Sequence, residues 1–232
     1  MREAPPPLPP EQRTVGQLVA ESIRAYGDDF WRALPLGLPL AVADQAAAGH
    51  ALAAQSLVYW LATPLFAAAY LWACRLVLGG RPTRTAAALA VVIWLPFPAL
   101  RSLFVLPGLA WLAFAGLAVP AATAEGTGFR ASLVRGRQLA RAGFAHVLGS
   151  LCALVVVVGV AAGVLGTLLH TQSASSARVA TFLSDLVLSP LLYLGAAILY
   201  VDQSARLRSR HAGVHPPLEA DAAGRADARV EP

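Results

Sequence analysis

Long runs of apolar residues, separated by short polar or arginine-containing segments, follow one another through most of the chain. Six of these runs approach or exceed the length of about 20 residues that a helix needs to cross the hydrocarbon of a bilayer. They cover residues 31–48, 52–78, 86–105, 108–124, 144–169 and 179–201. The pattern therefore predicts an all-α membrane bundle of six transmembrane helices.

The boundary between the third and fourth helices is open to two interpretations. The step Leu106-Pro107-Gly108 suits a turn between them, because proline and glycine are typical turn residues. Pro96, Pro98 and Arg101 would also suit an earlier turn. We expect the later position.

The segment before the first apolar run has the pattern of an amphipathic helix. Thr14 followed by Gln17 is typical of a capping box at a helix start. The apolar side that follows consists of Val15, Leu18, Val19, Ser22, Ile23, Tyr26 and Phe30. A helix of this kind before a span commonly lies in the membrane interface, although it could also pack on the bundle. Residues 1–13 and 206–232 are expected to be disordered tails, which leaves 14–205 as the membrane domain.

Composition supports lipid as the solvent. Hydrophobic residues make up 57% of the 232 residues and charged residues only 13%, whereas soluble domains carry about 25% charged residues. A chain with so little charge could not cover its apolar surface in water. The composition therefore excludes an ordinary soluble domain.

The distribution of positive charge predicts the orientation. All 18 basic residues are arginine, and they occur at the ends of the apolar runs rather than on one solvated face, which argues against nucleic-acid binding. If the N-terminus is cytoplasmic, only Arg101 and Arg178 fall on the outer side. Cytoplasmic loops carry the excess of arginine. We therefore expect a multi-pass protein of the inner (plasma) membrane with both termini in the cytoplasm.

The connector at 125–143, between the fourth and fifth runs, is basic and amphipathic. An apolar stripe of Phe129, Leu133, Ala140 and Phe144 is flanked by arginines. Near an anionic leaflet, each arginine gains about 1 kcal/mol from the surface potential. The candidate contacts to anionic lipid headgroups are Arg130, Arg135, Arg137 and Arg141. The alternative is that these arginines only fix the topology.

This connector also carries a recognisable motif. A proline precedes an acidic residue at the end of one run, and a glycine, an arginine-rich stretch with leucines and a Gly-aromatic pair follow. The residues are Pro120, Glu125, Gly128, Phe129, Leu133, Arg135, Leu139, Arg141, Gly143 and Phe144. The motif and the opening stretch 14–34 resemble the membrane domain found beside bacterial glycerophosphodiester phosphodiesterases and its stand-alone relatives.

The resemblance covers residues 14–205 in architecture and is specific over 120–150. Arg135-Gly136 departs from the Arg-Ser pair that relatives often have. The family implies a helical membrane domain, and its phosphodiesterase activity belongs to a separate soluble domain. The resemblance therefore implies no enzymatic activity for this chain.

Ionisable groups inside apolar runs are candidates for function, because burying a charge in lipid is costly. Asp185, near the outer end of the sixth run, is the strongest candidate, and we expect it to pair with Arg101. A boundary charge and a transport or proton-handling site are the alternatives. On the inner side, we expect Arg75 to pair with either Glu125 or Asp202.

Gly159 and Gly163 form a GxxxG motif in the fifth run. Small residues at this spacing let two helices approach closely. Packing within the chain is the favoured interpretation, with dimerisation as the alternative.

The sequence offers little catalytic chemistry. It lacks the HExxH, GxSxG and P-loop motifs, and Cys74 and Cys152 have neither CxxC spacing nor a histidine close by. We expect no cofactor, metal or enzymatic activity. The leading hypothesis is a membrane scaffold, partner-binding module or lipid organiser in contact with anionic headgroups. A small transporter or permease component is the alternative, and the oligomeric state is open.

Overall fold

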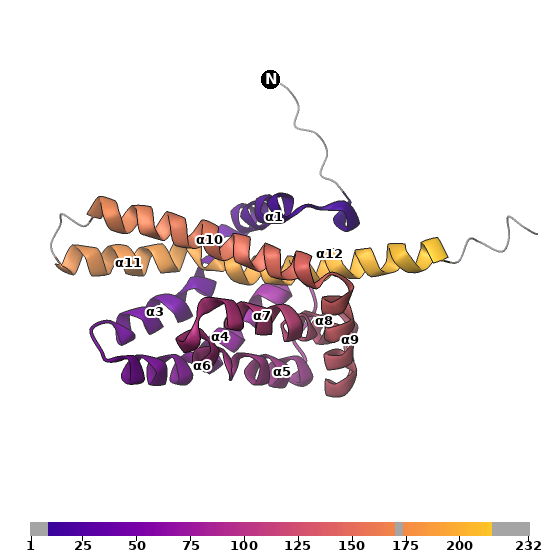
Figure 1. The fold of residues 1–232 in the computed structure, drawn as a ribbon, viewed down its shortest axis with the longest axis horizontal. Helices are drawn as coiled ribbons and strands as arrows, with labels where there is room; N and C mark the ends of the chain where they lie inside the picture. The colour runs from indigo at the N-terminus through magenta and orange to yellow at the C-terminus, as the bar shows by residue number, and fades with distance from the viewer. Residues whose placement is uncertain (1–8, 170–173, 215–232) are drawn as a thin grey trace, which may run out of the picture.

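The computed structural model describes residues 9–169 and 174–214, and every regular element in these ranges is a helix. The prediction of an all-α bundle is therefore confirmed. In chain order the elements are η1 (Pro10–Gln12), α1 (Val15–Asp28), α2 (Phe30–Ala33), η2 (Leu34–Gly37), α3 (Leu38–Ala47), α4 (Leu52–Leu78), α5 (Arg84–Trp94), α6 (Phe97–Leu103), α7 (Val105–Ala115), α8 (Ala118–Glu125), α9 (Phe129–Ala142), α10 (Phe144–Leu169), α11 (Ala174–Leu188) and α12 (Pro190–Val214). Figure 1 shows their arrangement along the long axis of the molecule.

Four stretches of the described chain are long and apolar enough to cross a membrane. They are Leu52–Leu78, Val105–Glu125, Phe144–Leu165 and Ser176–Arg210, and a shorter apolar helix covers Arg84–Leu100. The first predicted span, residues 31–48, is divided among α2, η2 and α3, because Pro35 and Pro39 remove backbone donors early in the segment. The structure thus gives a membrane-type bundle with four long apolar helices, and its two further apolar segments are shorter or broken.

Contacts between these segments fix their directions. The side chain of Trp72, late in α4, donates to the carbonyl of Arg32 (3.0 Å). At the opposite end of the bundle, the side chain of Gln45, near the end of α3, donates to the carbonyl of Arg178 (2.8 Å). A Cβ on Gly80, just after α4, would lie 2.9 Å from the carbonyl oxygen of Thr123 in α8. Helices α4 and α8 therefore finish at the same end, which we call the α9 end. The α5–α6 segment runs back from that end, and α3 lies in the half of the bundle away from α9 (Figure 1).

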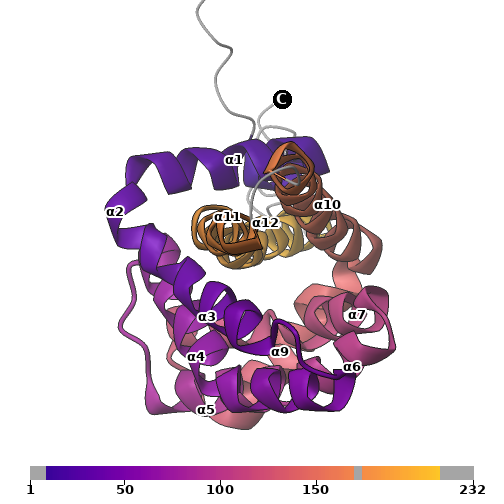
Figure 2. The same ribbon diagram turned by 90° about the vertical axis from the view of Figure 1, so that its left-hand side faces the viewer.

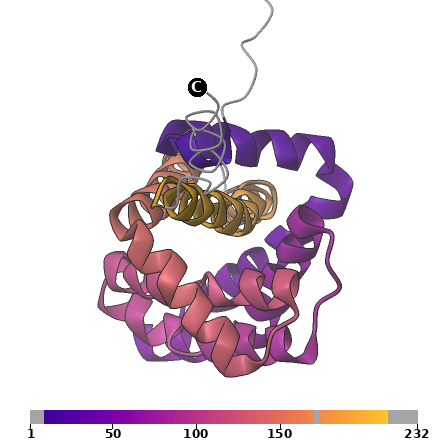
Figure 3. The same ribbon diagram turned by 90° about the vertical axis from the view of Figure 1, so that its right-hand side faces the viewer.

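Helix α12 is the central element of the bundle. Figures 2 and 3 show α11 and α12 enclosed by α1, α3, α4 and α10. The buried side chains of α12 include Leu194, Ala197, Leu199, Asp202 and Gln203. The sixth predicted span ends at residue 201, whereas α12 continues to Val214. The extension packs beside the end of α9, where Arg210 donates to the carbonyl of Ala142 (2.8 Å).

Helices α1 and α9 both lie across the long helices, α9 at the end of the bundle and α1 nearer the middle of its long axis (Figures 1 to 3), and we call this pair the collar. The capping box predicted at the start of α1 is confirmed by reciprocal bonds between Thr14 and Gln17. Leu18 and Ser22 of α1 are buried, whereas Ile23 is 51% exposed. The apolar side of α1 thus packs on the bundle while its outer face stays accessible.

The turn before α7 occurs at Phe104, whose backbone is extended between two helices. It lies just before the predicted Leu106-Pro107-Gly108 step, which instead forms the first turn of α7. A proline in the first turn of a helix loses no hydrogen bond, because that amide has no intrahelical partner. This explains why Pro107 is tolerated inside the helix.

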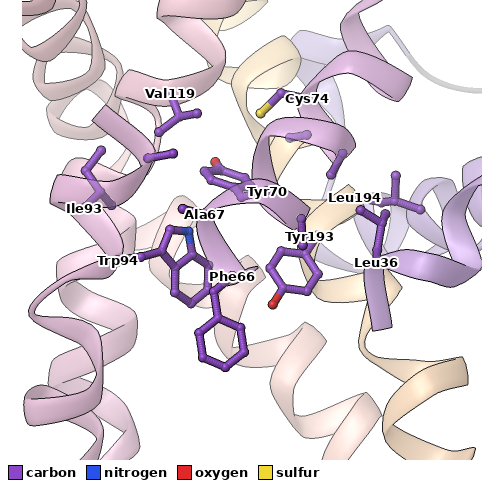
Figure 4. Close-up of a cluster of buried hydrophobic side chains, with 14 of the residues drawn as sticks. Leu36, Phe66, Ala67, Tyr70, Cys74, Ile93, Trp94, Val119, Tyr193 and Leu194 are labelled. Atoms are coloured by element: carbon purple, nitrogen blue, oxygen red, sulfur yellow. The ribbon is translucent and has the colours of Figure 1, made fainter. Parts of the chain in front are cut away.

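The main apolar core lies where α4, α5, α8 and α12 meet. Figure 4 shows Phe66, Tyr70, Trp94 and Tyr193 around the middle of this cluster, with Ile93, Val119 and Leu194 beside them. Aromatic side chains bury large apolar areas and so dominate the packing energy of such a core. The core therefore fixes α4 and α5 against the central helix.

Candidate functional site

A cavity of about 360 Å³ lies beside this core, among α3, α4, α5, α6, α7, α10, α11 and α12. Ligand sites commonly occupy concave volumes of about 300–1,000 Å³. Most of its wall is aliphatic or aromatic, and the wall also includes the carboxylates Asp44 and Asp185. The cavity is therefore an apolar chamber with two acidic residues in its wall.

Six aromatic rings line one side of the cavity. Trp94 is their centre, with ring-centroid distances of 4.9 Å to Phe97, 5.6 Å to Phe66, 5.8 Å to Tyr193 and 6.4 Å to Tyr70. Tyr59 extends the group by stacking on Phe66 (6.4 Å). Figure 4 shows Phe66, Trp94 and Tyr193 gathered together. The six residues form one interconnected aromatic part of the cavity's surface.

Several polar groups interrupt this surface. The Tyr59 hydroxyl donates to the carboxylate of Asp44, which links the aromatic side of the cavity to α3. Trp94 is 9% exposed, and its indole nitrogen has no hydrogen-bond partner among the described residues. A buried donor without a partner is costly, and this N–H is an unsatisfied group within the aromatic core.

The cavity reaches the side of the bundle between α7 and α10. Val105 of α7 is 52% exposed and contributes to the wall, as does the exposed Gly159 of α10. A Cβ on Gly159 would meet no atom within 4 Å. This lateral mouth would face the hydrocarbon if α7 and α10 cross a bilayer.

A second polar site ties the collar to the central helix. The Arg13 guanidinium lies 3.0 Å from the carboxylate of Asp202, which is buried, and 3.8 Å from Glu21 of α1. Arg206 donates to the carbonyl of Arg13 and lies 3.3 Å from the imidazole of His146. Burial of Asp202 is thus compensated by a guanidinium from the segment before α1.

The joint from α8 through α9 to α10 is built by close contacts. Glu125, at the end of α8, accepts from Arg135 of α9 (3.0 Å) and from the hydroxyl of Tyr200 in α12 (3.0 Å). A Cβ on Gly136 would lie 2.6 Å from the backbone nitrogen of Ala118. Only glycine permits this approach of α9 to α8, because any side chain there would overlap the backbone.

The arginines of α9 divide into two groups. Arg135 is bonded to Glu125 and half-buried, whereas Arg130, Arg137 and Arg141 are exposed. Among the described residues, none of these three forms an ion pair, and Arg137 lies over the ring of Phe114 at 5.4 Å. The packed face of α9 consists of Ser132, Gly136, Leu139 and Ala140. The predicted stripe is only partly buried, since Phe129 and Phe144 are 40% and 39% exposed.

The ion pairs predicted for Arg75 are wrong. Glu125 pairs with Arg135 and Asp202 pairs with Arg13, while the Arg75 guanidinium lies 5.3 Å from the ring centre of Trp72 on its own helix. The reason is proximity, because α9 and the segment before α1 bring arginines directly to these carboxylates. The predicted partner of Asp185, Arg101, belongs to α6, but its side chain lies outside the described part of the structure.

The interpretation of Gly159 and Gly163 as a packing surface within the chain is also wrong. Both are exposed, and a Cβ at either position would meet nothing within 4 Å. They lie among exposed valines of α10, including Val156, Val160 and Val164. Close helix contacts occur instead at Gly136 and at Gly37, where a Cβ would overlap the carbonyl of Leu186.

Sequence reasoning missed two residues of these sites. Asp44 lies within the first predicted span, so the rule that singled out Asp185 would also have found Asp44. Arg13 was assigned to a disordered tail because of the prolines before it, and no local signal indicates its contact with Asp202. Among the described residues, no group of His, Cys, Asp and Glu has the arrangement of a metal site.

Comparison with protein-family models, with curated proteins and with solved structures gave no match. The described residues define a class, an all-α bundle in which four helices are long and apolar enough to cross a membrane. The resemblance to the phosphodiesterase-associated membrane domain stays a prediction.

Proposed function

We propose that this protein is a non-enzymatic, multi-pass membrane protein that organises anionic lipids at its cytoplasmic face. The observation that carries the proposal is the surface of α9, where Arg130, Arg137 and Arg141 are exposed beside half-exposed Phe129 and Phe144. Arginine with exposed aromatic and apolar residues is typical of helices in the headgroup region. The collar would lie in the plane of the cytoplasmic leaflet.

A six-pass topology in the plasma membrane, with both ends cytoplasmic, is part of this proposal. Its support comes from the directions of the helices. Since α4 and α8 finish at the same end, the α5–α6 segment between α4 and α7 has to return across the bundle, and the contacts of Arg32 and Gln45 indicate the same for the α2–α3 segment. Arg13 and Arg210 both lie at the α9 end, which the positive-inside rule assigns to the cytoplasm.

The resemblance to the phosphodiesterase-associated membrane domain is kept within this proposal. The residues that carry it form the α8–α9–α10 joint, in which Glu125 is paired with Arg135. Gly143 lies close to Gln203, because a Cβ on Gly143 would lie 2.9 Å from the side-chain oxygen of Gln203. The departure from the family pattern at Gly136 coincides with the closest approach of α9 to α8. We infer that the motif serves to hold α9 in position and has no catalytic role.

Lipid retention tests the proposal. Protein purified in mild detergent is mixed with equal amounts of phosphatidylglycerol and phosphatidylcholine, and native mass spectrometry counts the lipids that remain bound. We expect wild type to retain phosphatidylglycerol preferentially. A variant with Arg130, Arg137 and Arg141 replaced by Gln loses up to about 3 kcal/mol, or roughly 100-fold in affinity, at about 1 kcal/mol for each arginine.

The matched control replaces Arg24, Arg81 and Arg84 by Gln, three exposed arginines outside α9. This variant has the same net charge as the α9 variant and is expected to lose less of the lipid preference, because Arg24 is paired with Glu21 and Arg81 and Arg84 lie outside the amphipathic surface of α9. Equal loss in both variants, or no preference in wild type, contradicts the assignment of the headgroup site to α9.

A small transporter is the second candidate, and the cavity is the observation that favours it. Asp44 and Asp185 line a chamber within the bundle, as a transported solute would require. Its wall is mainly apolar, and Thr63 is buried with its hydroxyl bonded to the Tyr59 carbonyl (3.2 Å). Gradient-driven accumulation of radiolabelled amines by proteoliposomes, lost in Asp185→Asn, would support transport. Failure to accumulate any of them would count against it.

A further inference from the structure

We propose that the cavity among α3, α4, α7, α10 and α11 is a binding site for a hydrophobic organic cation. The ligand would have an apolar body and an ammonium group. This inference rests on the cavity alone and is independent of the lipid contacts of α9. It therefore goes beyond the proposed function and can fail without it.

The charge of the ligand follows from the composition of the wall. Asp44 contributes a carboxylate from α3, and the described residues that line the cavity include no arginine. Asp44 is oriented by the hydrogen bond from Tyr59, so its carboxylate is held beside the aromatic rings. A carboxylate in an apolar, partly buried site favours a cation over a neutral or anionic molecule.

The aromatic rings strengthen this preference. Tyr59, Phe66, Phe97 and Tyr193 form an interconnected group around Trp94. The faces of such rings attract organic ammonium groups, and a desolvated contact is worth about 2 kcal/mol. Acidic and aromatic groups therefore select the same class of ligand from two directions.

The route of entry agrees with a hydrophobic ligand. The cavity reaches exposed positions at Val105 and Gly159, between α7 and α10. A molecule with an apolar body concentrates in the bilayer and can enter from the side. Because a Cβ at Gly159 meets no atom within 4 Å, a larger side chain there would narrow the mouth without disturbing the fold.

The test compares two probes that differ only in charge. Tritiated 4-butoxybenzyl-trimethylammonium is the cation, and 1-butoxy-4-neopentylbenzene, with carbon in place of the quaternary nitrogen, is the neutral analogue. Equilibrium dialysis against wild-type protein in nanodiscs, with empty nanodiscs subtracted, measures specific binding. We expect the cation to bind at least about tenfold more tightly, which corresponds to about 1.4 kcal/mol.

Two pairs of variants locate the site. Asp44→Asn is expected to weaken cation binding about tenfold or more while leaving the neutral analogue unchanged, whereas Asp28→Asn on the exposed face of α1 has no effect. Gly159→Leu is expected to weaken the binding of both probes. Gly163→Leu, on the same helix but outside the cavity wall, is expected to change the binding of neither probe. Equal binding of the two probes to wild type, no binding of the cation, or unchanged binding in Asp44→Asn overturns the proposal. The comparison of probes on wild type holds even if a variant fails to fold.

Discussion

The guanidinium of Arg13 lies 3.0 Å from the carboxylate of Asp202, a buried group on the central helix. The two residues are 189 positions apart in the chain. Their contact attaches the segment before α1 to α12, the central helix of the bundle. The segment before α1 is thus attached to the central helix by a charged contact, in addition to the apolar packing of α1.

Removing one member of this pair is expected to destabilise the protein strongly. Arg13→Gln leaves the buried carboxylate of Asp202 without its cation, and loss of one partner of a buried pair costs about 3–5 kcal/mol. Arg24→Gln is the control, because Arg24 is 57% exposed in its pair with Glu21 and such surface pairs are worth about 0–1 kcal/mol. Chemical unfolding in detergent micelles measures the free energy of unfolding of both variants. Similar losses in the two variants would show that the Arg13–Asp202 pair contributes no more than a surface contact.

Charge reversal tests the assignment of the partner of Glu125. Glu125→Arg and Arg135→Glu each place like charges together. Each is expected to lower the free energy of unfolding by about 1 kcal/mol or less, because both side chains are partly exposed, and the melting temperature falls with it. The double reversal restores most of the loss. Glu125→Arg combined with Arg75→Glu should restore none, because Arg75 lies over Trp72 instead. Rescue by the Arg75 variant would reinstate the pair expected from the sequence.

Gly136 is expected to tolerate no larger residue. Its Cβ would lie 2.6 Å from the backbone nitrogen of Ala118, and overpacking of this kind costs about 1–3 kcal/mol. Gly149→Ala in α10 is the control, because a Cβ there meets no atom within 4 Å and alanine is the better helix former by about 1 kcal/mol. Melting curves should therefore move in opposite directions. An unchanged melting temperature in Gly136→Ala would mean that α8 and α9 are less closely packed than described.

The fold class could be predicted from the sequence because apolar length and arginine placement are properties of each segment by itself. The capping box at Thr14 and Gln17 was predictable for the same reason, since both partners lie within one turn. The break of the first span into α2, η2 and α3 follows from prolines that are visible in the sequence, but their effect depends on neighbours that replace the lost hydrogen bonds.

The candidate sites were less predictable, because they depend on contacts between distant segments. Asp185 was singled out by its position in an apolar run, but the cavity it lines is built from eight helices. The partners of Glu125 and Asp202 depend on how α9 and the segment before α1 cross the bundle. The exposure of Gly159 likewise depends on which face of α10 meets the rest of the chain.

Thiol labelling tests the central claim, a membrane bundle whose collar faces the cytoplasm. Cys74 and Cys152 are replaced by Ser, and a single cysteine is then introduced at Ala48 or at Ser209, both exposed. With a membrane-impermeant maleimide on intact spheroplasts, we expect Ala48→Cys to be labelled and Ser209→Cys to be labelled only after permeabilisation. Labelling of Ser209→Cys in intact spheroplasts, with Ala48→Cys protected, would contradict the account.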